Sequence, residues 1–277
     1  MLICIGAPDF SALSEGQMVA CVSDPFRHPE RVKQAMDAKV TLMSMDMIPR
    51  RLSRAQAMDV NSSQDNLAGY KAVLMGAAQV PKGIPMMTTS AGTVRPAKFV
   101  IMGSGVAGLQ AIATAKRLGA IVYASDVRKS TAEQIQSVGG RFIEVEGMDD
   151  FEDDSGYAKP LTPEFIQKVN DTVCEVAADA DVVVTTARIF GRPAPITVPG
   201  FSRCKLQTRI CCCRYERRCW RQLRIDLSGR NHHDRKWSDH RRDHQSSWSI
   251  GLYCKHAVFQ QFDHLCGFSC QGWRNCH

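Results

Sequence analysis

The chain lacks any long hydrophobic run. None of its 277 residues belong to an apolar stretch that approaches the ~20 residues a membrane-spanning helix needs. The amino-terminal segment has no basic start, and Pro8 and Asp9 interrupt its apolar residues, so we expect no signal peptide. These absences predict a cytoplasmic protein, in which any role at a membrane comes from a partner.

The first 200 residues are poor in the side chains that carry acid–base chemistry or bind metals. They contain one histidine, His28, and three scattered cysteines, Cys4, Cys21 and Cys174. Because the cysteines have none of the spacings typical of a metal site, we predict no metal. His28 precedes Pro29 and is interpreted as a helix-start residue. A dehydrogenase acting on a hydroxy or amino acid needs a general base near its substrate, and this stretch of the chain lacks an evident one.

The composition changes abruptly after Gly200. The last 77 residues carry 15 Lys and Arg against 6 Asp and Glu, which leaves 20 against 22 for the first 200. The same 77 residues hold 9 of the 12 Cys, 7 of the 8 His and all 4 Trp. The basic excess therefore belongs to this tail and not to the rest of the chain.

Between Val19 and Thr186, short apolar runs alternate with amphipathic stretches. This alternation predicts βα units and a parallel sheet, that is, an α/β fold. The predicted strands cover residues 18–22, 39–44, 98–102, 121–125, 141–144 and 182–186. The predicted helices cover residues 29–37, 63–76, 105–118 and 131–138, with one more opening at Thr162 and Pro163. Beyond Gly200 the alternation stops, and the tail offers no apolar strand to a parallel sheet.

The strongest local motif is the glycine-rich run at residues 103–108, directly after the predicted strand 98–102 and before a helical pattern. In a Rossmann-like unit, the first glycine allows a tight turn and the second lets the backbone approach a pyrophosphate. The third lets the helix and strand pack closely, and the helix start directs N–H groups at the phosphates. We therefore predict a dinucleotide site that includes Gly103, Gly105, Val106, Ala107 and Gly108.

An acidic residue ends the next predicted strand. Asp126 lies 23 residues after Gly103, where a carboxylate can accept hydrogen bonds from the adenosine ribose, which favours NAD over NADP. In an alternative, Arg128 and Lys129 hold a 2′-phosphate, but the carboxylate would repel that group. We include Val127 and Arg128 in the predicted site. The carboxyl end of strand 182–186 adds Thr185, Thr186 and Ala187, because open α/β sheets bind ligands at that edge.

The polar run at residues 49–64 would by itself be read as a solvated loop. However, it places Arg51, Gln56, Asp59 and Ser62 in the order and spacing of a loop in the NAD(H)-binding domain of the proton-translocating NAD(P) transhydrogenase alpha subunit. The segments 64–70, 88–98 and 156–159 are similar to that family as well, which also includes alanine dehydrogenase. The resemblance implies that these four residues position the nicotinamide and that Tyr157 closes over NAD(H).

The resemblance further implies hydride transfer between NADH and NADP⁺, with NADP(H) held on a partner domain. Such transfer needs orientation of two rings and no general base, which agrees with the single histidine. The implied partners are the NADP-binding and membrane domains of the beta subunit and a second copy of the domain, with no nucleic acid. The chain would then be cytoplasmic and peripheral to the inner membrane. Two alternatives remain: an alanine dehydrogenase-like NAD enzyme and an inactive nucleotide-binding remnant.

The resemblance covers residues 15–200, and family members begin some tens of residues earlier. We expect a partial amino-terminal α/β subdomain at 1–87, a Rossmann NAD(H)-binding domain at 88–200 and a disordered Cys, Arg, His and Trp-rich tail at 201–277. A zinc module or a disulfide framework in the tail is disfavoured by its spacings and by the absent export signal. A shift of the reading frame by one base instead gives sequences resembling the family's continuation at 211–216, 237–248 and 256–265, so we interpret the tail as frameshifted.

Overall fold

The computed structural model describes residues 1–50, 52–145, 162–186 and 209–210. The described residues fall into two units, residues 1–64 and the residues from Asp65 onwards. The division lies within helix α2 (Val60–Ala77), whereas the boundary predicted from the sequence lies between residues 87 and 88. None of the helices within the described ranges is long and apolar enough to cross a membrane.

The first unit is a three-stranded parallel sheet with short helices. Its strands are β1 (Leu2–Gly6), β2 (Met18–Val22) and β3 (Thr41–Ser44), in that spatial order. Helix α1 (Pro29–Asp37) starts at a proline, as predicted, and joins β2 to β3. The short 3-10 helices are η1 (Phe10–Ala12), η2 (Met45–Met47) and η3 (Ser53–Met58). Strand β1 was not predicted, because five residues at a chain start have no preceding turn signal to mark them.

A buried carboxylate fixes the carboxyl end of this sheet. Asp46 accepts hydrogen bonds from the backbone N–H groups of Ser23 and Asp24, at 3.1 and 2.9 Å, and from the Ser44 hydroxyl at 2.6 Å. The Asn61 amide donates to the Asp46 carbonyl at 2.8 Å. One residue therefore ties the ends of β2 and β3 to the start of α2.

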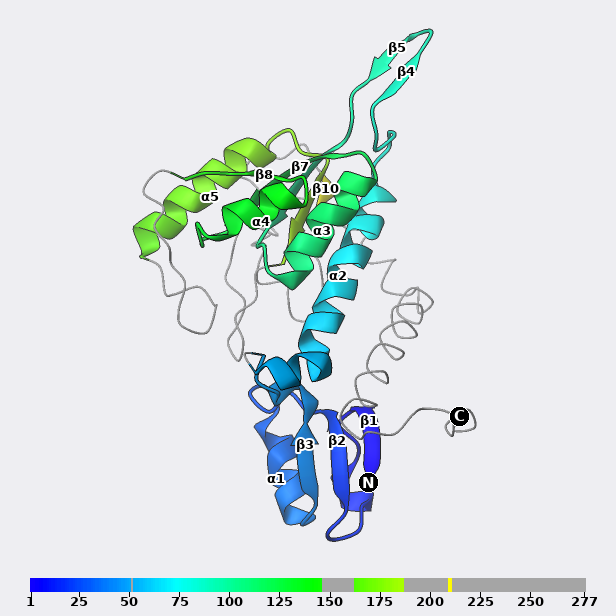
Figure 1. The fold of residues 1–277 in the computed structure, drawn as a ribbon, viewed down its shortest axis with the longest axis vertical. Helices are drawn as coiled ribbons and strands as arrows, with labels where there is room; N and C mark the ends of the chain where they lie inside the picture. The colour runs from blue at the N-terminus through cyan, green and yellow to red at the C-terminus, as the bar shows by residue number, and fades with distance from the viewer. Residues whose placement is uncertain (51, 146–161, 187–208, 211–277) are drawn as a thin grey trace, which may run out of the picture. The chain divides into compact units, whose positions relative to one another are not determined.

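The second unit contains a five-stranded parallel sheet, in the order β10-β9-β6-β7-β8 (Figure 1). The strands are β6 (Lys98–Met102), β7 (Ile121–Ser125), β8 (Arg141–Phe142), β9 (Val182–Thr185) and β10 (Arg209–Ile210). The connecting helices are α3 (Val106–Arg117), α4 (Thr131–Ser137) and α5 (Pro163–Ala177). The Rossmann-like α/β class expected from the sequence is the fold that the structure shows.

Helices cover both faces of this sheet, because its strands are apolar on both sides. Val182 and Val184 of β9 face one cluster with α2, α3 and α4, whereas Val183 faces the other cluster with α5. Strand β6 pairs with β7 on one side and with β9 on the other. The chain order thus reverses at β6, and ligands bind at such a switch point in open α/β sheets.

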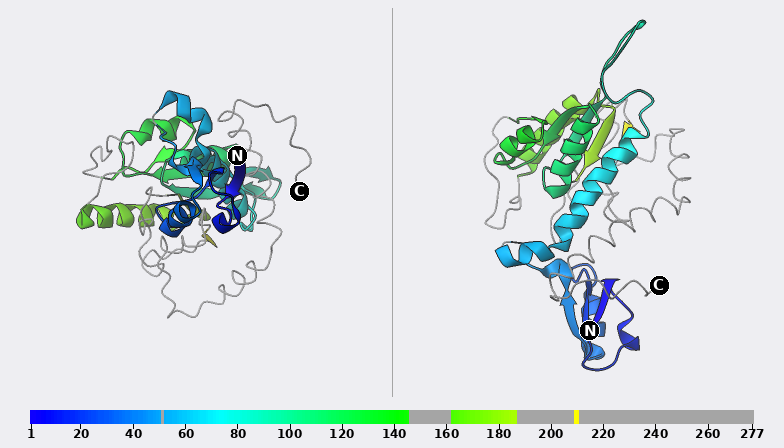
Figure 2. Two further views of the ribbon diagram at one scale, coloured as in Figure 1. Left: turned by 90° about the horizontal axis from the view of Figure 1, so that it is seen from below. Right: turned by 45° about the vertical axis from the view of Figure 1, so that its right-hand side comes forward.

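Two elements differ from the sequence prediction. The hairpin of β4 (Met87–Thr89) and β5 (Gly92–Val94) was not predicted, and it extends away from the five-stranded sheet (Figures 1 and 2). The prediction that the tail offers no strand is wrong at two residues, since β10 pairs with β9. An edge strand needs a partner on one side only, so two residues can pair without forming a long apolar run.

Candidate functional site

The loop between β6 and α3 has the geometry of a phosphate-binding turn. Gly103 adopts φ +95°, a conformation that L side chains rarely adopt, and its N–H donates to the Ser125 carbonyl at 2.8 Å. Gly105 precedes α3, and a Cβ on Gly105 would have no heavy atom within 4 Å. The first N–H groups of a helix have no partner within the helix, and they favour an anion. Space and donors therefore meet at Gly105.

Close backbone contacts hold the first turn of α3. A Cβ on Gly108 would lie 2.7 Å from the carbonyl carbon of Gly103 and would overlap the oxygen. A Cβ on Gly69 of α2 would lie 2.8 Å from the carbonyl carbon of Ala107 and would again overlap the oxygen. Only glycine fits at either contact without a shift of backbone, so both glycines set the position of this turn.

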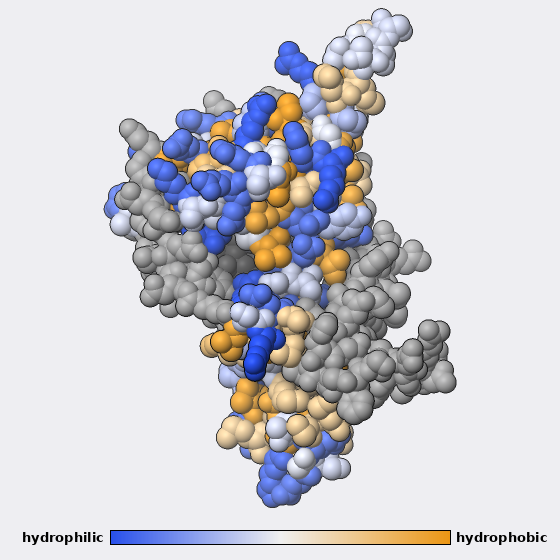
Figure 3. Space-filling view, viewed as in Figure 1, coloured by the Kyte–Doolittle hydropathy of each residue, from blue (hydrophilic) through white to orange (hydrophobic). Residues whose placement is uncertain are grey.

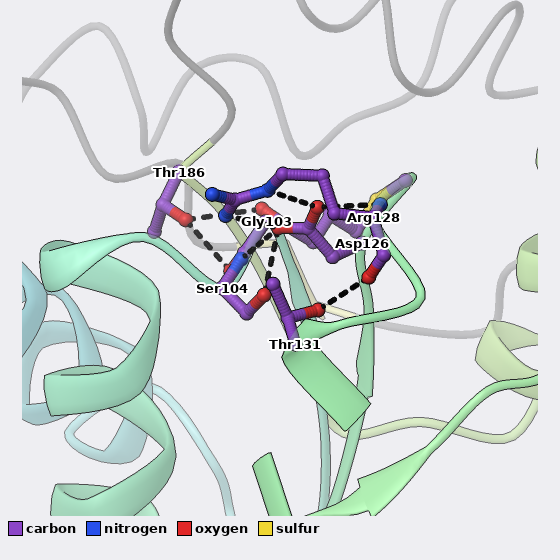
Figure 4. Close-up of polar contacts among 7 residues, drawn as sticks. Gly103, Ser104, Asp126, Arg128, Thr131 and Thr186 are labelled. Atoms are coloured by element: carbon purple, nitrogen blue, oxygen red, sulfur yellow. Dashed lines mark hydrogen bonds and ion pairs between the residues drawn. The ribbon is translucent and has the colours of Figure 1, made fainter. Parts of the chain in front are cut away.

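Asp126, which follows β7, is joined directly to the glycine loop (Figure 4). Its Oδ2 accepts from the Ser104 N–H and from the Ser104 hydroxyl, both at 2.7 Å. Its Oδ1 accepts from the N–H and the Nε of Arg128, both at 3.0 Å, and Arg128 Nη2 donates to Oδ2 at 3.1 Å. The carboxylate that the sequence assigns to the ribose is therefore buried among protein donors.

These donors hold the Asp126 carboxylate in its charged form. Burial alone would raise the pKa of Asp126, but the hydrogen bonds and charge of Arg128 and the hydrogen bonds of Ser104 outweigh it, so the pKa is lowered. The Arg128 carbonyl is fixed in turn by the N–H and hydroxyl of Thr131, at 3.2 and 2.8 Å. The turn after β7 therefore presents an ionised acceptor on a rigid backbone.

The two threonines at the end of β9 have different surroundings. The Thr186 hydroxyl lies 3.1 Å from the Met102 carbonyl and 3.0 Å from the Gly103 carbonyl, beside the glycine loop. Thr185 is 1% exposed, and its hydroxyl has no hydrogen-bond partner among the described residues. Because alternate residues of a strand face opposite sides, Thr186 lies on the α3 side of the sheet and Thr185 on the α5 side.

In the first unit, Asp59 and Ser62 come together at the start of α2. The Ser62 N–H and hydroxyl donate to Asp59 at 2.9 and 2.6 Å. Arg50 donates to Asp59 Oδ2 from Nε at 3.1 Å and to the Ser62 hydroxyl from Nη2 at 2.6 Å. Burial would raise the pKa of Asp59, but the hydrogen bonds of Ser62 and the nearby Arg50 lower it. The Gln56 side chain is exposed, and no hydrogen bond within residues 52–145 joins it to this cluster.

Comparison with known proteins assigns this arrangement. Residues 72–200 match the family model described as alanine dehydrogenase/PNT, C-terminal domain. These residues belong to that domain family. The chain is 46% identical over 195 residues to the first segment of the divided NAD(P) transhydrogenase subunit alpha of Rhodospirillum rubrum, covering 70% of this chain and 50% of the relative. It is 44% identical over 185 residues to NAD(P) transhydrogenase subunit alpha of Cereibacter sphaeroides, covering 66% and 35%.

Solved structures agree with the assignment to the alanine dehydrogenase/PNT family. The transhydrogenase structure from Sinorhizobium meliloti has a TM-score of 0.61 and 43% identity, over 72% of this chain and 53% of that chain. An L-alanine dehydrogenase structure has a TM-score of 0.52 at 20% identity, over 76% and 54%, and this likeness concerns the fold alone. The chain spans about half the length of the Rhodospirillum rubrum relative that it matches.

Within this alanine dehydrogenase/PNT domain, the predicted nucleotide residues gather around two strand ends. Val106 and Ala107 form the first turn of α3, and Val127 lies between Asp126 and Arg128. Arg51, Tyr157 and Ala187 lie outside the described residues.

Sequence reasoning overlooked three residues that support the site. Ser104 occupies a variable position of the glycine motif, although its hydroxyl holds Asp126. Arg50 lies beside the predicted Arg51, and it is Arg50 that holds Asp59 and Ser62. Gly69 had one available signal, a glycine in the middle of an otherwise helical segment, which often marks a close approach of backbone.

Proposed function

We propose that this chain is the NAD(H)-binding part of a proton-translocating NAD(P) transhydrogenase. NADH would supply a hydride to NADP⁺ held on a partner domain. The observation that carries the proposal is the glycine loop, in which Gly105 leaves open space before α3 while Ser104 holds Asp126. The identity to transhydrogenase alpha subunits supports this choice among dinucleotide enzymes.

The residues present fit NAD(H). Gly105 would lie against the pyrophosphate, with the N–H groups of Val106 and Ala107 beside it. Asp126, held as an anion, would accept hydrogen bonds from the adenosine ribose. Thr186 would line the edge between β6 and β9. The work of these groups is to bind and orient the nucleotide, since hydride transfer between two nicotinamide rings depends on their alignment.

The nicotinamide end is assigned by the resemblance. Asp59 and Ser62, with Arg51 and Gln56, would position the ring and its carboxamide, and Tyr157 would close over the nucleotide. In support, the Arg50 guanidinium fixes the Asp59 and Ser62 side chains against one another. A pair fixed before binding loses less conformational entropy when a ligand arrives.

Substitution of Gly105 tests the proposal. A Cβ at this position meets no protein atom, so Gly105→Ala should fold normally while its methyl group intrudes on the pyrophosphate. We expect NADH affinity, measured by calorimetry, to fall at least about tenfold, or ~1.4 kcal/mol. Gly6→Ala is the matched control, because a Cβ on Gly6 also meets nothing within 4 Å. Equal NADH affinity in wild type and Gly105→Ala would exclude the glycine loop as the pyrophosphate site.

Two other functions give different results in the same assays. An alanine dehydrogenase-like enzyme would reduce NAD⁺ with alanine, which we do not expect, because no histidine other than His28 lies in the first 200 residues. An inactive remnant would not bind NADH at all. The transhydrogenase assignment predicts NADH binding without alanine oxidation, and hydride transfer to an NADP⁺ analogue only when the NADP-binding domain is added.

Assembly with other chains is included in the proposal. The expected partners are the NADP-binding and membrane domains of the beta subunit, which would bring this chain to the inner membrane, and a second copy of the domain. All six residues of β4 and β5 are exposed, and Figure 3 shows no strongly hydrophilic surface along the two strands. A two-stranded hairpin alone is marginally stable in water, which favours packing against another chain. Sedimentation of the protein with and without residues 87–94 would test the homodimer.

The tail requires a proposal of its own. We infer that residues 201–277 are translated in a shifted frame, with Arg209–Ile210 adding only a short edge strand to the sheet. Sequencing of the coding region tests this directly. Stop codons in the alternative frame within this stretch would refute it.

A further inference from the structure

The Arg128 side chain occupies the face of Asp126 that a ribose would use. The Asp126 carboxylate receives five hydrogen bonds, two on Oδ1 and three on Oδ2, whereas a carboxylate has about four acceptor positions. In Figure 4 the guanidinium runs from the end of β7 back across Asp126 toward the glycine loop. The side chains of Arg128 and Asp126 are only 17% and 8% exposed. The carboxylate therefore has no acceptor position to spare for a ligand.

The five hydrogen bonds divide into fixed and removable ones. The donors from Ser104 belong to the glycine loop, and the Arg128 N–H belongs to a backbone that Thr131 holds. The other two come from the guanidinium, at 3.0 Å on Oδ1 and 3.1 Å on Oδ2. A side-chain rotation of Arg128 removes these two and leaves the backbone in place. It vacates one position on each carboxylate oxygen.

We propose that Arg128 is a specificity-determining residue that caps Asp126 and is exchanged for the ribose diol of the nucleotide. The 2′- and 3′-hydroxyls carry two donors, which would replace the two guanidinium donors one for one. The inference rests on the proposed NAD(H) site and adds a competing group within the chain. Apparent affinity then falls by the fraction of molecules in which the carboxylate is uncapped.

The exchange discriminates between NADH and NADPH. A ribose diol offers hydrogens to Asp126, so it can compensate for the loss of the guanidinium. A 2′-phosphate offers none at neutral pH, and it would face an ionised carboxylate. Removal of the cap should therefore help NADH and give no benefit to NADPH. This is opposite to a role in which Arg128 binds the 2′-phosphate, because loss of the guanidinium would then weaken NADPH alone.

Arg128→Ala tests the exchange, with Lys129→Ala as the matched control. Both variants lose one positive charge in the same turn, but only Arg128 contacts Asp126 among the hydrogen bonds described. If nine tenths of the molecules are capped, NADH should bind Arg128→Ala roughly tenfold more tightly than wild type. NADPH affinity should not rise, and Lys129→Ala should not tighten NADH binding. Calorimetry with each nucleotide measures all three.

The outcomes separate the two proposals. If wild type does not bind NADH, the proposed function fails and the exchange fails with it. If wild type binds NADH but Arg128→Ala binds it equally or less tightly, the exchange alone is refuted. A second readout is the NMR signal of Arg128 Nε–H, which should move when NADH is added to wild type. The same signal should move in the apo Asp126→Asn variant, and an unchanged signal in either case would overturn the cap.

Discussion

Gly69→Ala is predicted to destabilise the protein even though it improves the intrinsic preference of α2. Gly69 lies within the helix, where alanine is favoured over glycine by ~1 kcal/mol. Against this, the added Cβ would overlap the carbonyl oxygen of Ala107 and lie 3.1 Å from its Cα. These atoms are backbone of the first turn of α3, so no flexible side chain can yield. The overlap can be relieved only if one of the two helices shifts.

Overpacking of this kind costs about 1–3 kcal/mol, and a backbone obstacle places Gly69 at the upper end. After the helix preference is subtracted, about 2 kcal/mol of destabilisation remains. For a domain of this size, that lowers the thermal midpoint by roughly 4–8 °C. Urea unfolding followed by circular dichroism measures the free energy, and thermal unfolding gives the midpoint.

Gly105→Ala serves as the control for this experiment. It adds the same methyl group at the start of α3, where nothing lies within 4 Å, so its unfolding free energy should stay within about 0.5 kcal/mol of wild type. NADH affinity provides a second readout, because a displaced α3 would move the glycine loop. A Gly69→Ala variant that is about 1 kcal/mol more stable than wild type would show that helix preference prevails and that the close contact is absent.

Two further predictions concern the charged clusters. The pKa values of Asp126 and Asp59 lie below their ordinary value of 3.8 in the folded state, so their stabilisation is present above that value. It is lost as the pH falls through the lowered pKa values, and Asp126→Asn should flatten the decline in thermal midpoint with acid. An unchanged slope would contradict this. Arg50→Ala removes the cation that lowers the pKa of Asp59, so we expect NMR titration to give a higher pKa and unfolding to give a loss of about 1 kcal/mol. A constant Asp59 pKa would show that Arg50 is not its partner in solution.

The elements that obey local rules could be predicted from the sequence. Strands β6, β7 and β9 are short and largely buried runs of apolar residues, and each was placed to within a residue of its observed end. The Gly103 turn follows from a motif in which position and conformation agree, since only a residue without a Cβ adopts φ +95° easily. The α/β class follows from the same pattern, because buried parallel strands need helices on both faces.

Features that depend on distant partners were not predicted. The residues of β4 and β5, including exposed Thr88 and Thr93, alternate no apolar face, so nothing in the pattern marks a hairpin. Gly69 and Ala107 are far apart in the sequence, and their contact exists only once α2 crosses α3. The choice of Arg50 as the partner of Asp59 likewise depends on how the segment before η3 turns, which composition does not specify.

Asp126 illustrates why motif spacing identifies a site without describing its state. Its place after β7 follows from a rule about strand ends, and that rule assigns the carboxylate to a ribose. The rule is silent on what the carboxylate contacts before a nucleotide arrives, and a buried anion requires donors at all times. Ser104 supplies two of them from the glycine loop, and Arg128 supplies the rest from its own turn. The arginine two residues beyond the acid is therefore a physical consequence of burying an acceptor in the unliganded protein, and nucleotide binding must compete with it.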